Sequence, residues 1–186
     1  MARKRMTKKC AKEAMEMTDP FAAYEYARKI IKGRWYQAEL NIMKDPEYAY
    51  KYARKIIEGR WYQAELNIMK NPYWAYNYAS YVIKGRWPEA EPHIMKWPYS
   101  AYCYARIFID GRWFEAEPYI MKDPEYAYKY ARYVIEGRWP EAEPCIMKSA
   151  DPKNPLSDRV WAKRYAHWYA RNFIRVMLGR CANHTS

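Results

Sequence analysis

The sequence predicts an all-α solenoid of five two-helix repeats with a helical cap at each end. Three observations support this fold class: residues 19–148 consist of five gapless copies of a 26-residue unit, each copy has the apolar pattern of two short helices, and the flanking segments depart from the repeat. Helix pairs this short cannot bury their apolar faces alone, whereas stacked copies share one continuous core. The expected organisation is therefore a cap at 1–18, repeats at 19–148 and a linker with a capping helix at 149–186.

The five copies are closely similar, and fourteen of their 26 positions hold one residue type throughout. The segments 29–44 and 55–70 differ only in Lys32 against Glu58. Because a recent duplication also produces identity, the positions that vary between copies are more informative about function than the positions that do not.

The first helix of each copy has clear end signals, illustrated by the second copy. Asp45 is a suitable N-cap, and Pro46 fits the first helical position, where its missing N–H costs nothing. Gly59 is expected to take the left-handed conformation that ends the helix. The helical period then predicts one wide apolar face consisting of Tyr48, Ala49, Tyr52, Ala53, Ile56 and Ile57.

A second, shorter helix is predicted after each Gly-Arg-Trp turn. In the last three copies it contains Pro92, Pro118 or Pro144, where the first two copies have Leu40 and Leu66. Proline is tolerated only in the first turn of a helix. We therefore expect a short or partly 3₁₀ second helix in the last three copies.

Both ends of the chain have features of solenoid caps. Residues 9–18 align with a second helix and are predicted to form an N-terminal half-repeat. Near the other end, the run YAHWYARNFI at 165–174 resembles the start of a first helix, and we expect a long helix from Asp158 to Leu178. Atypical terminal units of this kind are typical of repeat proteins.

The wording of the repeat resembles a known group of sequences. Tandem DPxYAYxYAxxVIxGRWPEAEPxIMK units, present here at 123–148, resemble repeats of uncharacterised tailed-bacteriophage proteins. The paired short helices are also similar to the leucine-rich-repeat-variant and HEAT-like α-solenoids. The phage resemblance implies a chain that acts in the host-cell cytoplasm on a host protein, for example as an inhibitor of host defence, and it implies no catalytic residue.

The repeated charged and aromatic residues favour structural roles over catalysis. Glu39 and its counterparts recur every 26 residues and face arginines such as Arg34 at the same period, which predicts an Arg–Glu ladder. Catalysis instead needs unlike groups that converge once in a pocket. Trp35 and its counterparts are expected in the core, with a base-stacking platform as the alternative. We expect no enzyme, no cofactor and no metal site, since Cys181 and His184 supply only two of four zinc ligands.

The net charge of +12 is concentrated at the two ends of the chain. Residues 1–18 hold six basic and two acidic residues and residues 149–186 hold seven and two, whereas the repeats are close to neutral. Nucleic-acid binding through these ends is therefore the alternative function, with basic soluble end-plates as the other interpretation. Its candidate residues are Arg3, Lys4, Arg5, Lys8, Lys9, Lys163, Arg164, Arg171 and Arg175. No apolar run is long enough to span a membrane and no secretion signal is evident, so a cytoplasmic protein is expected.

The variable positions predict a contact surface on the first helices. Charged residues of other copies are replaced by aromatic or apolar side chains in the later copies, on the sector that the helical wheel assigns to solvent. This predicted patch consists of Tyr73, Asn77, Tyr81, Tyr99, Cys103, Ile107 and Tyr133. The leading hypothesis is a non-enzymatic module that binds a protein partner through the patch, with a homodimer contact and internal packing as alternatives. A small-ligand site between repeats has no convergent polar cluster in its support.

Overall fold

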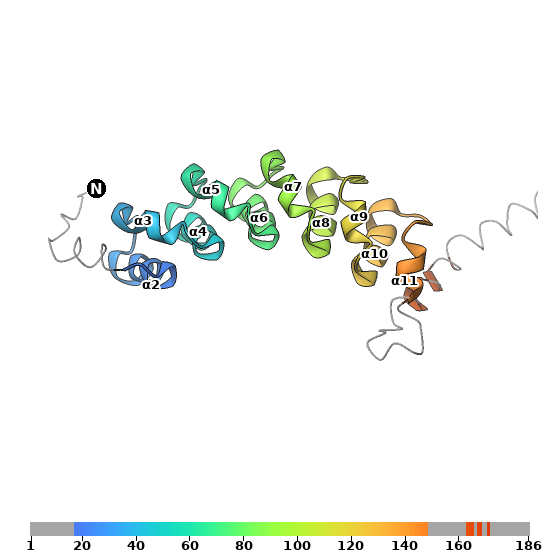
Figure 1. The fold of residues 1–186 in the computed structure, drawn as a ribbon. Helices are drawn as coiled ribbons and strands as arrows, with labels where there is room; N and C mark the ends of the chain where they lie inside the picture. Colours follow the sequence, from blue (N-terminus) through green and yellow to red (C-terminus); the bar gives the residue numbers. More distant parts are fainter. Residues whose placement is uncertain (1–16, 149–162, 166, 169–170, 172–186) are drawn as a thin grey trace, which may run out of the picture. The chain divides into compact units, whose positions relative to one another are not determined.

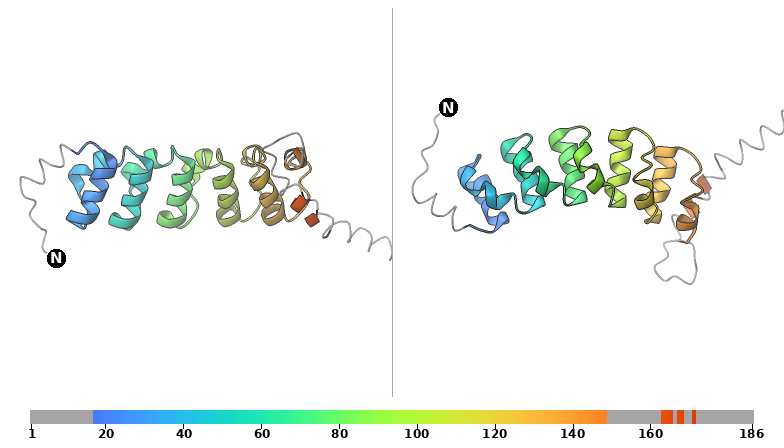
Figure 2. Two further views of the ribbon diagram at one scale, coloured as in Figure 1. Left: turned by 90° about the horizontal axis from the view of Figure 1, so that it is seen from below. Right: turned by 45° about the horizontal axis from the view of Figure 1, so that its top comes forward.

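The computed structural model describes residues 17–148, 163–165, 167, 168 and 171. These residues form helices and their connections, and no strand occurs among them. The chain divides into two compact units, residues 1–94 and 95–186. In each unit the helix pairs stack on their neighbours (Figures 1 and 2), which confirms the predicted all-α solenoid.

The first unit contains three helix pairs. In each pair an α-helix continues into one π-helical turn, and a second helix follows. The elements are α2 (Pro20–Tyr26), η1 (Ala27–Ile31), α3 (Tyr36–Ile42), α4 (Pro46–Tyr52), η2 (Ala53–Ile57), α5 (Tyr62–Ile68), α6 (Pro72–Tyr78), η3 (Ala79–Ile83), η4 (Pro88–Ala90) and α7 (Glu91–Ile94). Helix α4 packs between α2 and α6, and α3, α5 and α7 each pack against the first helix of their own pair.

The second unit repeats this arrangement. Its elements are α8 (Pro98–Tyr104), η5 (Ala105–Ile109), α9 (Glu117–Ile120), α10 (Pro124–Tyr130), η6 (Ala131–Ile135) and α11 (Glu143–Lys148). Residues 163–165, 167 and 168 are also helical. The rest of the predicted C-terminal helix, and all but the last two residues of the predicted N-terminal half-repeat, lie outside the described residues.

The predicted start of the first helix is confirmed. The Asp45 carboxylate accepts hydrogen bonds from the backbone N–H groups of Glu47 and Tyr48, at 2.8 and 3.2 Å. Pro46 occupies the first turn, where no N–H is needed. Asn71 and Asp123 cap α6 and α10 in the same way.

The prediction for the end of this helix is wrong by one residue. Glu58, not Gly59, has the left-handed conformation, with a φ of 59°. The N–H groups of both residues reach back to the Ala53 carbonyl, so the chain reverses direction directly after the π-helical turn. The same left-handed conformation occurs at Lys32, Lys84, Asp110 and Glu136.

The prolines shorten the second helices, as predicted. Helices α3 and α5 begin directly after their tryptophans, whereas α7, α9 and α11 begin only at Glu91, Glu117 and Glu143. In the third copy a 3₁₀ turn, η4, precedes the helix. Each proline therefore falls within the first turn, where no backbone hydrogen bond is lost.

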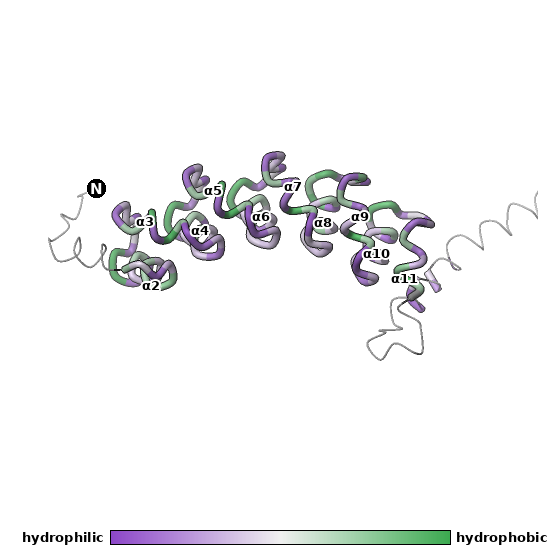
Figure 3. Tube along the Cα trace, viewed as in Figure 1, coloured by the Kyte–Doolittle hydropathy of each residue, from purple (hydrophilic) through white to green (hydrophobic). Residues whose placement is uncertain are grey.

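The core of each repeat contains alanine, tyrosine, tryptophan and isoleucine. Alanines of the first helix such as Ala49 and Ala53 are fully buried, which lets neighbouring first helices pack closely. Trp61 is 1% exposed, and its ring lies 5.0 Å from that of Tyr52 in the same repeat. Hydrophobic and hydrophilic residues alternate along each helix pair (Figure 3), consistent with one buried and one exposed side.

Candidate interaction surfaces

A network of three side chains joins the second helix pair to the third. Arg60 donates two hydrogen bonds to the Glu65 carboxylate, at 2.9 and 2.8 Å. The hydroxyl group of Tyr78, from the following repeat, lies between the Glu65 carboxylate and the backbone of Trp61. This hydroxyl donates to Glu65 at 3.0 Å and accepts from the backbone N–H of Trp61 at 2.6 Å.

The same network recurs along the chain. It also consists of Arg34, Glu39, Tyr52 and Trp35, then of Arg112, Glu117, Tyr130 and Trp113, and finally of Arg138, Glu143, Tyr165 and Trp139. The predicted Arg–Glu ladder is thus confirmed. Each carboxylate is held by a guanidinium and a phenol.

The last network shows that the C-terminal segment replaces a first helix. The sequence likeness of 165–174 to a first helix aligns Tyr165 with Tyr48, one helical turn before Tyr52. The structure nevertheless gives Tyr165 the contacts of Tyr52, because its hydroxyl donates to Glu143 at 3.1 Å. The segment therefore packs one turn away from the register that its sequence suggests.

The electrostatics of the network follow from burial and pairing. Burial raises the pKa of Tyr52, Tyr78 and Tyr130 far above the ordinary value of 10.0, and that of Tyr165 to about 12. The Arg138 guanidinium lowers the pKa of Glu143. In the last network, the neutral Tyr165 phenol therefore donates its hydrogen bond to an ionised Glu143 carboxylate.

The repeated tryptophans belong to the core and are not a base-stacking platform. Trp35, Trp61, Trp87 and Trp139 are each 1% exposed, and Trp113 is 6% exposed. Their faces are therefore closed to a ligand.

The predicted patch divides between the two units. In the first unit, Tyr81 is 50% exposed, and the Arg54 guanidinium lies 4.2 Å from the centre of its ring. Tyr73 is half-buried and its ring packs against Trp74. The Asn77 amide donates to the Tyr73 carbonyl at 2.8 Å, so it is engaged within its own helix.

In the second unit, Ile107 and Tyr133 are 55% and 43% exposed. Cys103 is half-buried, and the half-buried Tyr99 packs its ring against Tyr126 at 5.7 Å. Tyr81, Ile107 and Tyr133 are therefore the patch residues that present the most surface to solvent, whereas Tyr73 and Tyr99 pack against neighbouring aromatic rings.

A more exposed apolar surface lies on the second helices of the first two copies. Tyr36 and Leu40 on α3 are 65% and 71% exposed, and Tyr62 and Leu66 on α5 are 67% and 71% exposed. We call these four residues the apolar stripe. Residues four apart lie on one helical face, so each helix presents a tyrosine and a leucine together.

The signal for the apolar stripe is present in the sequence. The positions of Leu40 and Leu66 hold proline in the other three copies, and the positions of Gln37 and Gln63 hold glutamate there. Sequence reasoning used the Leu-to-Pro change only to predict helix length and did not consider exposure. The comparison shows that the fold tolerates proline at the leucine position, so the leucines are not required for the repeat to form.

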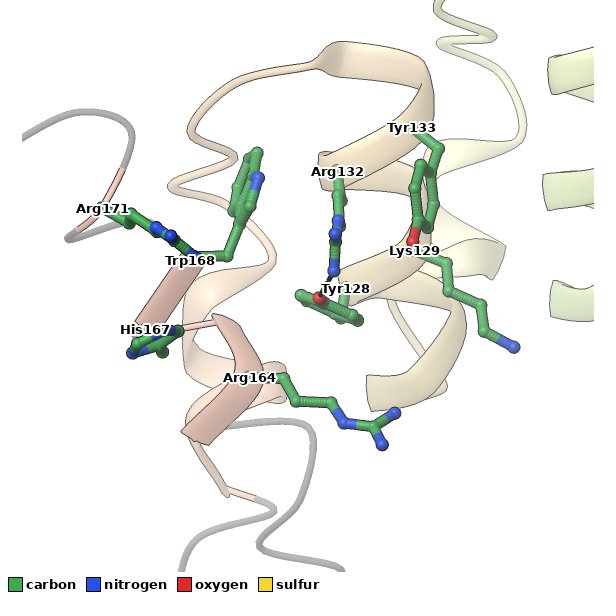
Figure 4. A pocket seen from close by; sticks show the side chains of 8 residues that line it. All are labelled: Tyr128, Lys129, Arg132, Tyr133, Arg164, His167, Trp168 and Arg171. Carbon is green, nitrogen blue, oxygen red and sulfur yellow. Dashed lines mark hydrogen bonds between the residues drawn. The ribbon is translucent and has the colours of Figure 1, made fainter.

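The basic residues proposed for nucleic-acid binding are only partly described. Lys163, Arg164 and Arg171 are exposed, and the last two line one pocket of about 530 Å³ in the second unit (Figure 4). The remaining candidates lie outside the described residues: Arg3, Lys4, Arg5, Lys8, Lys9 and Arg175.

Metal-binding clusters and membrane-spanning helices are both absent from the described part of the chain. No group of three His, Cys, Asp or Glu side chains there is placed to hold a metal ion. Among the same residues, no helix combines the length and the apolar character that crossing a bilayer requires.

Comparisons with known proteins give no relative: no protein-family model, curated protein or solved structure matches the sequence. A functional conclusion therefore depends on the chain's own surfaces.

Proposed function

We propose that the chain is a non-enzymatic repeat protein whose apolar stripe binds an amphipathic segment of a protein partner. The observation that supports this most strongly is the 71% exposure of Leu40 and Leu66, at positions where the other copies have proline. Covering a leucine side chain in an interface is worth about 1.5–3 kcal/mol. Two leucines and two tyrosines on adjacent repeats supply the apolar centre that a specific interface needs.

The charge around the stripe indicates the chemistry of the partner. Residues 19–70 hold ten basic and seven acidic residues, and Gln37 and Gln63 remove the glutamates that other copies place beside this face. Lys44 and Lys70 are exposed just beyond the helix ends. The stripe therefore suits a segment with apolar side chains on one side and acidic residues at its margins.

The predicted patch is the second candidate contact within the same function. Tyr81 and Tyr133 are exposed beneath Arg54 and Arg132, at 4.2 and 5.0 Å, just as Tyr36 and Tyr62 of the stripe lie beneath arginines at 4.6 and 4.7 Å. The stripe is preferred because its leucines are more exposed and have no counterpart in the other repeats.

The experiment is a selection of displayed helical peptides on the full-length protein, followed by measurement of the dissociation constant for the enriched peptides. We expect peptides with apolar anchors and flanking Asp or Glu. The double variant Leu40→Gln/Leu66→Gln should weaken their binding by about 100-fold, which corresponds to about 1.4 kcal/mol for each leucine. Phe114→Gln is the matched control, because Phe114 is 64% exposed on another repeat.

Two outcomes would overturn the proposal: no peptide is enriched, or enriched peptides bind the double variant as tightly as the unchanged protein. A third outcome would show that the stripe binds a second copy of this chain and not a different protein. In that case, size-exclusion chromatography with light scattering would show a concentration-dependent dimer that the double variant abolishes.

The phage resemblance adds a setting to the proposal, namely a host protein bound in the cytoplasm of an infected cell. It is supported only by the wording of the repeats. A host protein that the unchanged chain retains from a bacterial lysate, and that the double variant does not retain, is the expected result. Retention by both proteins, or by neither, would contradict it.

A further inference from the structure

The pocket in the second unit combines basic and aromatic side chains, and none of the described residues that line it carries a carboxylate. It lies between the end of α10 with η6 and the C-terminal segment, and its volume is about 530 Å³ (Figure 4). This size falls within the range of small-molecule sites. The lining residues are Tyr128, Lys129, Arg132, Tyr133, Arg164, His167, Trp168 and Arg171.

The described residues that line the pocket include four cationic side chains and no anionic one. Lys129 pairs with Glu125 at 2.5 Å, so that cation is offset. Arg132 donates to the Tyr128 hydroxyl at 2.6 Å and lies over the Tyr133 ring at 5.0 Å. Within the described residues, neither Arg132 nor Arg171 forms an ion pair. Two uncompensated guanidinium groups match the charge of a phosphate monoester, which their planar donors can bind bidentately.

The aromatic side chains supply the second recognition element. Figure 4 shows the Trp168 indole drawn between Arg171 on one side and Arg132 on the other. Trp168 is half-buried, unlike the closed tryptophans of the repeats. A ring in such a position can stack against a nucleobase, and base–aromatic stacking is worth about 1–3 kcal/mol.

A second pocket in the same chain serves as an internal comparison. It lies in the first unit beside η2 and η3, has a volume of about 460 Å³, and contains Arg54, the counterpart of Arg132. However, its lining includes the Glu58 carboxylate and only one aromatic side chain, Tyr81. The C-terminal segment therefore adds Arg164, Arg171 and Trp168 to a basic surface that in the first unit has one aromatic ring and a carboxylate.

We propose that the pocket in the second unit binds a nucleotide, with Arg132 and Arg171 on its phosphate and Trp168 on its base. The ligand is a nucleoside monophosphate unit, either free or within a single strand. This site is separate in the chain from the apolar stripe, and it does not depend on the function proposed for the stripe.

The test is isothermal titration of the full-length protein with AMP, adenosine and inorganic phosphate. We expect AMP to bind at least about tenfold more tightly than either of its parts, because it alone engages both recognition elements. Arg171→Ala should weaken AMP binding by about tenfold or more, because Arg171 forms no ion pair among the described residues and its charge is available to the phosphate. Trp168→Ala should weaken AMP but not phosphate binding, and the matched control Arg54→Ala should leave both unchanged.

A single-stranded RNA of about ten nucleotides distinguishes a free nucleotide from a nucleotide within a strand as the ligand. Tighter binding of the RNA than of AMP, with a steep salt dependence, identifies a strand, and equal affinity identifies a free nucleotide. The proposal is overturned if neither AMP nor RNA binds at millimolar concentration, or if phosphate binds as tightly as AMP. It is also overturned if Arg171→Ala changes nothing. Leu40→Gln/Leu66→Gln should retain AMP binding, so the two sites can fail independently.

Discussion

Replacing Tyr78 by phenylalanine removes one hydroxyl group from the contact between two repeats and leaves the ring in place. That hydroxyl accepts from the Trp61 N–H at 2.6 Å and donates to Glu65 at 3.0 Å. A buried N–H without a partner costs about 1–3 kcal/mol, and a hydrogen bond to a charged group contributes about 1.5–3 kcal/mol. Glu65 keeps its two hydrogen bonds from Arg60, which limits the second loss. We therefore expect the free energy of unfolding to fall by about 3 kcal/mol.

The assay is urea unfolding of the full-length protein, together with hydrogen exchange at the Trp61 amide. Because repeats contact only their neighbours, the loss of exchange protection should concentrate at this contact. Tyr62→Phe is the control, since Tyr62 is 67% exposed and its hydroxyl forms no hydrogen bond within the described residues. If both variants changed the unfolding free energy by less than about 0.5 kcal/mol, the network would not be what joins the repeats.

Three further predictions follow from individual residues. The pKa of Tyr165 is raised to about 12, and the pKa of Tyr78 also lies above the ordinary 10.0. The stability that these two phenols contribute is therefore complete below pH 10 and is lost as the pH rises toward their folded-state pKa values. Urea midpoints should fall between pH 9 and pH 12, and a flat profile would refute this. Ser100→Ala should stabilise the protein by about 1 kcal/mol, because the buried Ser100 hydroxyl has no hydrogen-bond partner in the described part of the chain, and an unchanged or lower thermal midpoint would contradict that expectation. Glu58→Gly should also raise the unfolding free energy by about 1 kcal/mol, since Glu58 has a φ of 59°, and calorimetry showing a decrease would disprove the strain argument.

Much of the repeat could be predicted from the sequence because it depends on local chemistry. The capping by Asp45, the position of Pro46 and the shortening of helices by Pro92 each involve residues within one turn of one another. The end of the first helix was harder to predict, because its hydrogen bonds span one residue more than in an α-helix. The left-handed residue is therefore Glu58, whose N–H bonds to the Ala53 carbonyl, and not the predicted Gly59.

The contacts between repeats could not be predicted, because they depend on how helices of different repeats pack. The spacing of residues along the sequence does not reveal this packing. The sequence paired arginine with glutamate but gave no sign that Tyr78 would join them. At the C-terminal end, sequence likeness aligned Tyr165 with Tyr48, but packing places Tyr165 against Glu143, as Tyr52 lies against Glu39.

The candidate surfaces were predicted unevenly for the same reason. The helical wheel assigned Tyr81 to solvent, and it is 50% exposed, but it did not show Tyr99 packing against a neighbouring ring. Leu40 had a visible sequence signal, whereas its 71% exposure required the structure. The pocket joins Arg132 to Arg171 from a different segment, which composition alone could not indicate.

The most direct test of the central claim is the ratio of dissociation constants for one selected peptide, measured on the unchanged protein and on Leu40→Gln/Leu66→Gln. We predict a ratio of about 100, with urea midpoints that stay within experimental error because both leucines are exposed. A ratio near one for a peptide that the unchanged protein binds would contradict the assignment of the apolar stripe as the binding surface.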